Sequence, residues 1–156
     1  METAAYHEAG HAVIASVLGG KVVTVSIESE SSEVDGDAVV AWKRGGRSDR
    51  EMALDDIRVA LAGPVAEMVH AGEYDYLRIR EEHALDWKIA LASLRSLGLT
   101  IDREAAMLQK TVAELYQTVR RDAIWSAIAD VADLLAVHGT IEGDAVNQTV
   151  EFWLNR

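Results

Sequence analysis

A short pattern of histidine and glutamate near the start of the chain constrains the fold more than any other feature. His7, Glu8 and His11 form an H-E-x-x-H pattern inside an apolar stretch that is predicted to be helical over residues 4–18. Residues four apart on an α-helix lie on one face, about 6 Å apart along the axis. The two imidazoles are therefore expected to face the same point in space.

Two imidazoles on one helical face are typical of a zinc site. Neutral imidazole suits Zn²⁺, and a catalytic zinc site usually has three protein ligands and leaves its fourth position to water. Glu8 lies beside that position, where a carboxylate can take a proton from the activated water as the water attacks a carbonyl. The pattern predicts His7 and His11 as metal ligands and Glu8 as the general base.

The pattern is uncommon by chance, but its residues also have a purely structural interpretation. H-E-x-x-H is expected by chance in fewer than roughly one in a hundred chains of this length. The alternative is a helix whose histidines and glutamate are solvated surface residues. Gly10 argues against that alternative, because glycine in a helix costs about 1 kcal/mol relative to alanine. Such a glycine is more typical of a place where another backbone or a substrate comes close.

Three stretches of the chain together resemble a known family. Residues 5–13 read Ala-Tyr-His-Glu-Ala-Gly-His-Ala-Val, residues 61–67 read Leu-Ala-Gly-Pro-Val-Ala-Glu, and residues 85–90 read Leu-Asp-Trp-Lys-Ile-Ala. They resemble the peptidase domain of the FtsH-type ATP-dependent zinc metalloproteases. The second stretch is similar to the family's Gly-Gly-Arg-Ala-Ala-Glu helix, and the third to the segment that carries its third metal ligand, an aspartate. The resemblance implies a metallopeptidase-like helical domain.

Spacing alone leaves the third ligand open between two neighbours. His83 belongs to the residue type that binds zinc more often, and it lies within one turn of Asp86. The resemblance favours Asp86, which matches the family's aspartate. Glu67 is a candidate to orient a metal-bound histidine, or else an ordinary surface residue. His70 and His138 end predicted helices, where the helix dipole explains them at least as well as ligation does.

Composition and charge narrow the class of protein. The 156 residues are 49% hydrophobic, and their net charge of −11 disfavours binding to nucleic acid or to anionic membranes. The chain has no cysteine, which excludes thiolate zinc sites and disulfides. Its apolar stretch around residues 12–23 is too short to span a bilayer. We expect a single domain over residues 1–156, with no nucleic-acid partner and no membrane segment, in the cytoplasm.

Periodicity and turn signals predict a predominantly α fold with a small β-hairpin or sheet, in the α+β class. The predicted strands cover residues 21–27 and 38–42. The loop between them, residues 28–37, carries five carboxylates. It could bind a cation or attract a basic substrate. We interpret it as a solvated loop, because its spacing fits no calcium-loop pattern.

The rest of the chain is predicted to be helical. Ser48 begins a helix that ends at Gly72, and Gly63-Pro64 should kink or break it where the motif helix packs against it. The polar and aromatic segment 73–80 is expected to be the most mobile connection. The remaining predicted helices cover residues 81–97, 103–138 and 144–152. Asp102 is the predicted cap of the second of these, and Arg120-Arg121-Asp122 is a candidate division of it into two helices.

The leading predicted function is a zinc-dependent endopeptidase that hydrolyses peptide bonds of unstructured polypeptides. His7, His11 and Asp86 would hold Zn²⁺, and Glu8 would act as general base. An extended substrate could add to the edge of the predicted hairpin. A zinc-dependent amide hydrolase or deacylase for a small substrate uses the same chemistry and stays open.

A non-catalytic interaction domain is the alternative, binding a partner protein with or without zinc. FtsH-type enzymes carry a membrane anchor and an ATPase module before the peptidase. No G-x-x-x-x-G-K-[ST] phosphate loop occurs in these residues, and Pro64 stands where the family has arginine. If the chain is an endopeptidase, we expect it to cleave without ATP, because no phosphate loop is present in these residues. Assembly into a homo-oligomer and association with a separate ATPase partner both stay open.

Overall fold

The computed structural model describes residues 2–28, 36–43 and 45–154, and these are mostly helical with a small antiparallel sheet. The predicted α+β class is confirmed. The elements in chain order are α1 (Glu2–Val17), β1 (Lys21–Ser26), β2 (Asp37–Ala41), α2 (Asp49–Ala71), α3 (Tyr76–Glu82), α4 (Ala84–Arg95), α5 (Ile101–Val119), α6 (Asp122–His138), β3 (Thr140–Glu142) and α7 (Gly143–Leu154).

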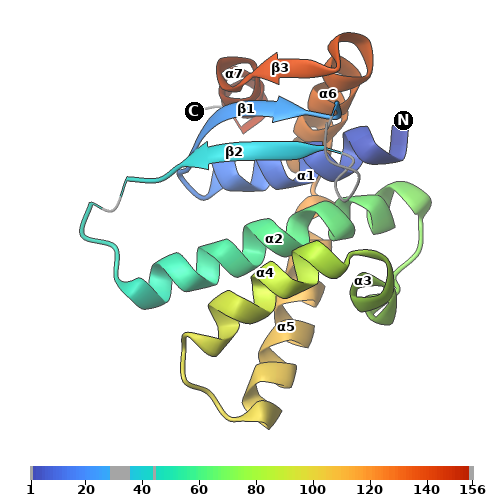
Figure 1. The fold of residues 1–156 in the computed structure, drawn as a ribbon. Helices are drawn as coiled ribbons and strands as arrows, with labels where there is room; N and C mark the ends of the chain where they lie inside the picture. Colours follow the sequence, from blue (N-terminus) through green and yellow to red (C-terminus); the bar gives the residue numbers. More distant parts are fainter. Residues whose placement is uncertain (1, 29–35, 44, 155–156) are drawn as a thin grey trace.

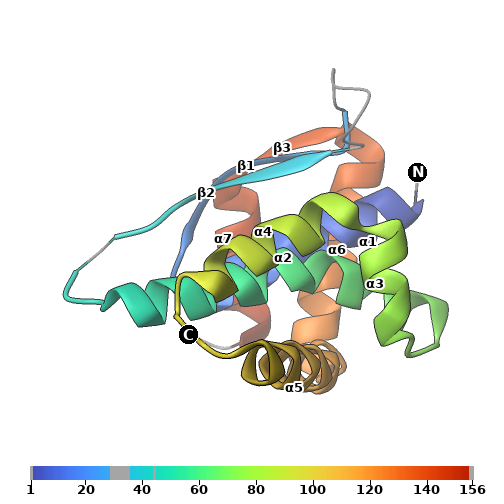
Figure 2. The same ribbon diagram turned by 60° about the horizontal axis from the view of Figure 1, so that its bottom comes forward.

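The elements pack around α1. The sheet lies on one side of α1 and α2 lies on the other, while α4 runs alongside α2 (Figure 1). α6 and α7 also pack against α1, and α5 lies on the side of the molecule away from the sheet (Figure 2). Buried apolar residues of α1, most of them alanines, form the centre of the core: Ala5, Ala9, Ala12, Val13, Ile14 and Ala15.

The contact between α1 and α2 is close because α1 has a glycine where the two helices meet. A Cβ atom on Gly10 would lie 2.6 Å from Cβ of Ala66 and 2.7 Å from the carbonyl oxygen of Ala62. Real Cβ atoms do not approach other atoms so closely, so only glycine fits without a shift of α2. The prediction that another backbone comes close to Gly10 is confirmed.

The caps of α2 agree with those predicted from the sequence, and of the predicted kink or break at Gly63-Pro64 the break does not occur. The Ser48 side chain accepts a hydrogen bond from the backbone N–H of Glu51 at 3.1 Å, and Gly72 ends the helix with a left-handed φ of 75°. The helix continues through Pro64. All residues from Ala60 to Ala66 are buried, so packing on both sides outweighs the hydrogen bond that proline removes.

The sheet has one strand more than predicted. Its order is β2-β1-β3, and both pairs are antiparallel. Val25 in the central strand faces Ala38 on one side and Ile141 on the other. β3 has three residues, too few for a periodic pattern to predict. Most of the predicted acidic loop lies outside the described residues, in residues 29–35.

The segment before Asp86 differs from its prediction. The expected mobile connection, residues 73–80, includes most of α3, whose N-cap Asp75 accepts a hydrogen bond from the backbone N–H of Arg78 at 3.3 Å. The helix predicted over residues 81–97 is therefore wrong in its start, because the backbone of His83, with φ −124° and ψ 54°, separates α3 from α4. An unrecognised aspartate cap explains the error.

The later helices agree with the sequence except at their ends. The predicted division near Arg121 is confirmed, since α5 and α6 are separate helices. Thr100 caps α5, in place of the predicted Asp102, by accepting a hydrogen bond from the backbone N–H of Arg103. Among the described residues, no helix combines the length and the apolar character needed to cross a bilayer.

Candidate metal centre

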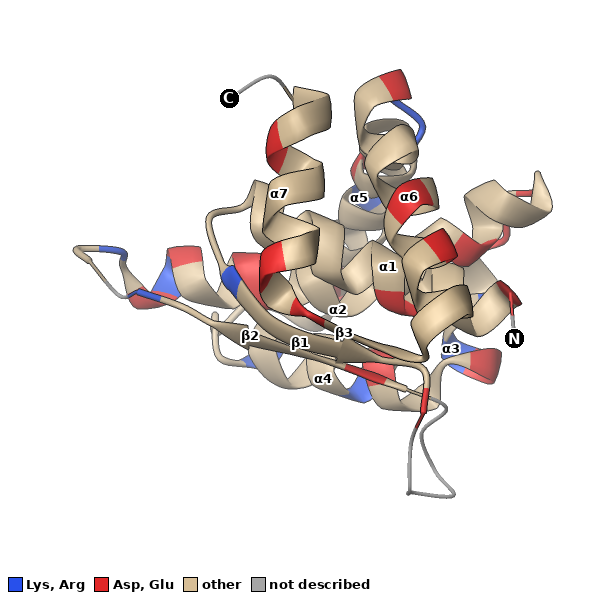
Figure 3. Ribbon diagram, turned by 90° about the horizontal axis from the view of Figure 1, so that it is seen from above, with Lys and Arg blue, Asp and Glu red and all other residues tan. Residues whose placement is uncertain are grey.

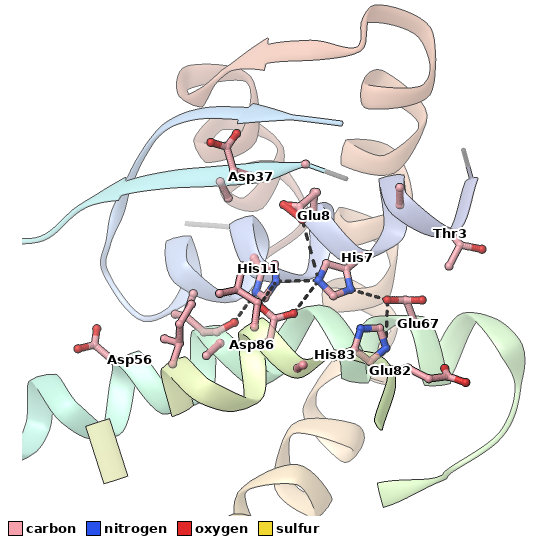
Figure 4. A pocket seen from close by; sticks show the side chains of 18 of the residues that line it. Thr3, His7, Glu8, His11, Asp37, Asp56, Glu67, Glu82, His83 and Asp86 are labelled. Carbon is pink, nitrogen blue, oxygen red and sulfur yellow. Dashed lines mark hydrogen bonds and ion pairs between the residues drawn. The ribbon is translucent and has the colours of Figure 1, made fainter. Parts of the chain in front are cut away.

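Two histidines of α1 point into the space between α1, α2 and α4. The Nε2 atoms of His7 and His11 lie 3.1 Å apart, and the ring planes are inclined by 78° (Figure 4). This convergence follows from the helical spacing of four residues. The expectation that both imidazoles face one point is confirmed, while their role as ligands stays a prediction.

α4 brings a carboxylate to the same point. Oδ2 of Asp86 lies 2.9 Å from Nε2 of His7, and Oδ1 lies 3.4 Å from Nε2 of His11 (Figure 4). Asp86 occupies the first turn of α4, which begins at Ala84 directly after the helix break. The structure therefore joins the predicted third ligand to the two histidines.

Two residues of α2 form hydrogen bonds with the Nδ1 atoms of the imidazoles, on the side of each ring away from the common point. Nδ1 of His7 forms a short hydrogen bond with Oε2 of Glu67, and Nδ1 of His11 donates to the carbonyl oxygen of Val59 at 2.6 Å. These bonds leave both Nε2 atoms directed at the common point. Gly63 completes the arrangement, because a Cβ atom there would collide with the ring of His11. Of the two interpretations that the sequence left open for Glu67, its contact with Nδ1 of His7 favours the orienting one.

The donor set fits a zinc ion. Zinc bound to nitrogen and oxygen at about 2.0–2.1 Å in tetrahedral geometry keeps its ligand atoms about 3.3 Å apart. Nε2 of His7 lies 3.1 Å from Nε2 of His11, and each of the two nitrogens lies near a different oxygen of Asp86, at 2.9 and 3.4 Å. Two imidazoles and one carboxylate also leave a fourth position open, as a catalytic site requires.

The two kinds of ligand shift one another's pKa in opposite directions. Burial by itself lowers the pKa of His7, but hydrogen bonds with Asp86 and Glu67 outweigh burial and raise that pKa to about 10. Burial by itself raises the pKa of Asp86, but hydrogen bonds from His11 and His7 outweigh it and hold that pKa well below its usual range. The carboxylates around His7 therefore favour a positive charge at this point.

Glu8 lies above this centre and is buried under the start of β2. Its Oε1 is 3.9 Å from Nε2 of His7, and the residue is 6% exposed. Burial raises the pKa of Glu8, although His11 and His7 act in the opposite direction. A Cβ atom on Gly36 would lie 2.9 Å from Cγ of Glu8, so this glycine lets the strand approach the carboxylate. Sequence reasoning missed Gly36, whose only signal was its place just before a strand.

A cavity of about 820 Å³ opens over the centre, between α1, β2, α2 and α4. Trp42, Leu85 and Ile89 are among the apolar side chains that line it. Acidic positions occur on most helices of the molecule (Figure 3). Among the described residues that line the cavity there is no lysine or arginine, and the six carboxylates are Glu8, Asp37, Asp56, Glu67, Glu82 and Asp86.

The remaining histidines have different places. His83 lines the cavity, and its ring stacks near that of His7 with centroids 5.1 Å apart. Burial lowers the pKa of His83, although the nearby Glu67 acts in the opposite direction. His70 instead stacks on Tyr6 and pairs with Glu2, and the exposed His138 ends α6. Neither His70 nor His138 lines the cavity.

Comparisons of the chain with models of protein families and with curated proteins found no match.

Proposed function

We propose that the chain is a zinc-dependent endopeptidase that cleaves unstructured polypeptides. The observation that carries the proposal is the convergence of His7, His11 and Asp86 at separations that suit one zinc ion, with Glu8 beside them. α1 and α4 are far apart in sequence, so a surface histidine pair does not account for the third donor. The hydrogen bonds of the Nδ1 atoms add a second reason, because they direct both Nε2 atoms towards the point where a metal would bind.

Each side chain of the centre would have a separate role in peptide hydrolysis. A zinc ion held here would supply a Lewis acid that polarises the scissile carbonyl and lowers the pKa of a water molecule. Glu8 would accept the proton from the attacking water and later donate it to the leaving amine. Its burial suits this role, because a raised pKa brings a carboxylate closer to neutral pH. Glu67 and the carbonyl of Val59 would keep the imidazoles in place.

The position of β2 favours an extended peptide as substrate. Among the residues that the structure describes, β2 pairs only with β1, so it is an edge strand. Asp37 and Ala38 at its start, and Gly36 just before it, line the cavity together with Glu8 and Asp86. A peptide that added to the free edge of β2 would run across the centre. A folded protein cannot adopt this extended form without unfolding, which costs about 5–15 kcal/mol.

The Glu8→Gln variant tests the proposal. It removes the base and keeps the ligands, so it should bind zinc and fold like the parent while cleavage of denatured casein falls by about 100-fold or more. Asp56→Asn, which changes a carboxylate in the cavity wall, is the matched control and should cleave normally. A chelator should abolish cleavage by the parent, and ATP should have no effect.

Two results would contradict the proposal. One is a zinc-loaded parent that leaves a broad library of unfolded peptides uncut. The other is a Glu8→Gln variant that cuts as well as the parent. Either result would favour the non-catalytic interaction domain, which needs the cavity and the fold but not the base.

A further inference from the structure

The candidate centre divides the cavity into two ends of different character. Glu82 lines one end, and Asp56 lines the other, beyond His11 (Figure 4). β2 and α4 both run from the first end towards the second (Figure 1). Residues that follow the centre along β2 and α4, including Trp42 and Ile89, therefore lie towards the second end, called here the Trp42 end.

Large apolar side chains from α4 and from the end of β2 line the Trp42 end. Ile89 follows Asp86 by three residues, about 4.5 Å along the helix axis, and it is 46% exposed. Trp42 comes directly after β2 and is half-buried, about 16 Å along the strand from Asp37. Covering an exposed isoleucine with another apolar group is favourable, so this end suits an apolar side chain of a ligand.

The free edge of β2 indicates which ligand covers these side chains. β2 is the strand of the sheet nearest to α2 and α4 (Figure 1), and within the described part of the chain it pairs with β1 alone. The backbone groups on its other edge therefore have no strand partner. An extended peptide satisfies such groups by strand addition, and alternate side chains of the peptide then face the groove beside the strand. A helix of a partner protein would leave the edge unpaired.

We propose that the Trp42 end is an apolar subsite, which selects substrates with a large apolar residue among the first three positions before the cleaved bond. The inference rests on the proposed function, because it names the substrate of that centre. β2 belongs to an antiparallel sheet, and antiparallel strand pairs outnumber parallel ones roughly two- to threefold. An antiparallel peptide on β2 runs from Trp42 towards the centre. At about 3.3 Å per residue, Ile89 faces one of the three residues before the cleaved bond.

The test uses the zinc-loaded full chain and a library of unstructured peptides, with cut sites identified by mass spectrometry. Leucine, methionine or phenylalanine should be enriched at one of the first three positions before the cut bond. The kcat/KM for a leucine peptide should exceed that for a matched alanine peptide by about tenfold or more, because an apolar pocket discriminates by about that factor for a single methylene.

Ile89→Asn should lower this leucine-to-alanine ratio by about threefold or more, because it replaces the apolar wall with an amide. Leu77→Asn is the matched control. Leu77 is also an exposed apolar residue on a helix, 72% exposed on α3, but it does not line the cavity. The control should keep the ratio of the parent, and circular dichroism checks the fold of both variants.

A binding measurement separates this inference from the proposed function. Fluorescence polarisation of the same labelled peptides on Glu8→Gln should show about tenfold tighter binding of the leucine peptide. If the parent cuts no peptide, the proposed function fails, and this comparison alone decides the subsite. Equal binding of the two peptides would overturn it. So would a preference for lysine or arginine, an apolar preference only after the cut bond, or a dimer of the chain that Ile89→Asn abolishes, since a second copy would then occupy the groove.

Discussion

The two halves of the candidate centre are held in different ways. His7 and His11 belong to α1, the most enclosed helix, and their imidazoles are fixed by hydrogen bonds to α2. Asp86 belongs to α4, which packs against α2 and α3 and buries only Ala90 and Leu94. The core therefore fixes two donors in advance, while the third comes from a helix at the edge of the molecule. A bound metal would join α4 to α1.

Of the changes considered, removal of the donor on α4 should lower zinc affinity most. We predict that Asp86→Ala weakens zinc binding by more than 100-fold, beyond the roughly 10–100-fold that loss of an outer partner costs. Competition with a chelator of known affinity measures the change. His83→Ala is the matched control three residues away, and it should keep its zinc. The opposite ranking of the two variants would make His83 the third ligand.

Loss of the support behind His7 should have a smaller effect. Glu67→Ala removes the hydrogen bond to Nδ1 but no donor of the candidate centre, so zinc affinity should fall by about 10–100-fold. The same competition assay measures it. An affinity equal to that of the parent would show that the core packing of α1 is enough to orient His7. An effect as large as that of Asp86→Ala would mean that Glu67 binds the zinc ion directly.

Zinc affinity should depend on pH through His7. The pKa of His7 in the metal-free chain is raised from 6.5 to about 10, and zinc needs the neutral ring. Binding should therefore release a proton, and affinity should rise about tenfold per pH unit between about pH 7 and pH 9. The raised pKa stabilises the metal-free fold fully below pH 6.5, and this contribution is lost as pH rises through about 10. Titrations at several pH values test the slope, and a flat profile would contradict it.

The smallest predicted effect is a change in amide hydrogen exchange when zinc is removed. Because α4 buries few residues, removal of zinc should speed amide hydrogen exchange in α3 and α4 while α1 stays protected. Hydrogen exchange followed by mass spectrometry, with and without zinc, makes the comparison. Equal loss of protection in α1 would show that the metal also supports the core, and that the two halves are not held differently.

The enclosed half was also the more predictable one. The shared face of His7 and His11 follows from helical spacing, and the close approach at Gly10 follows from the cost of glycine in a helix. The place of Asp86 depends on how α4 packs on α2, which no local pattern encodes, and only the family resemblance indicated it. α3 and β3 were missed because a seven-residue and a three-residue element carry too little periodicity.

The most direct test of the central claim is the position of zinc in a crystal of the full chain. Anomalous diffraction at the zinc edge should place a fully occupied ion about 2.0–2.1 Å from Nε2 of His7, Nε2 of His11 and an oxygen of Asp86. Glu8 should lie beside the fourth position without touching the ion. Absence of an anomalous peak between these three side chains in a zinc-loaded crystal, or a peak that His11 does not ligate, would contradict the account.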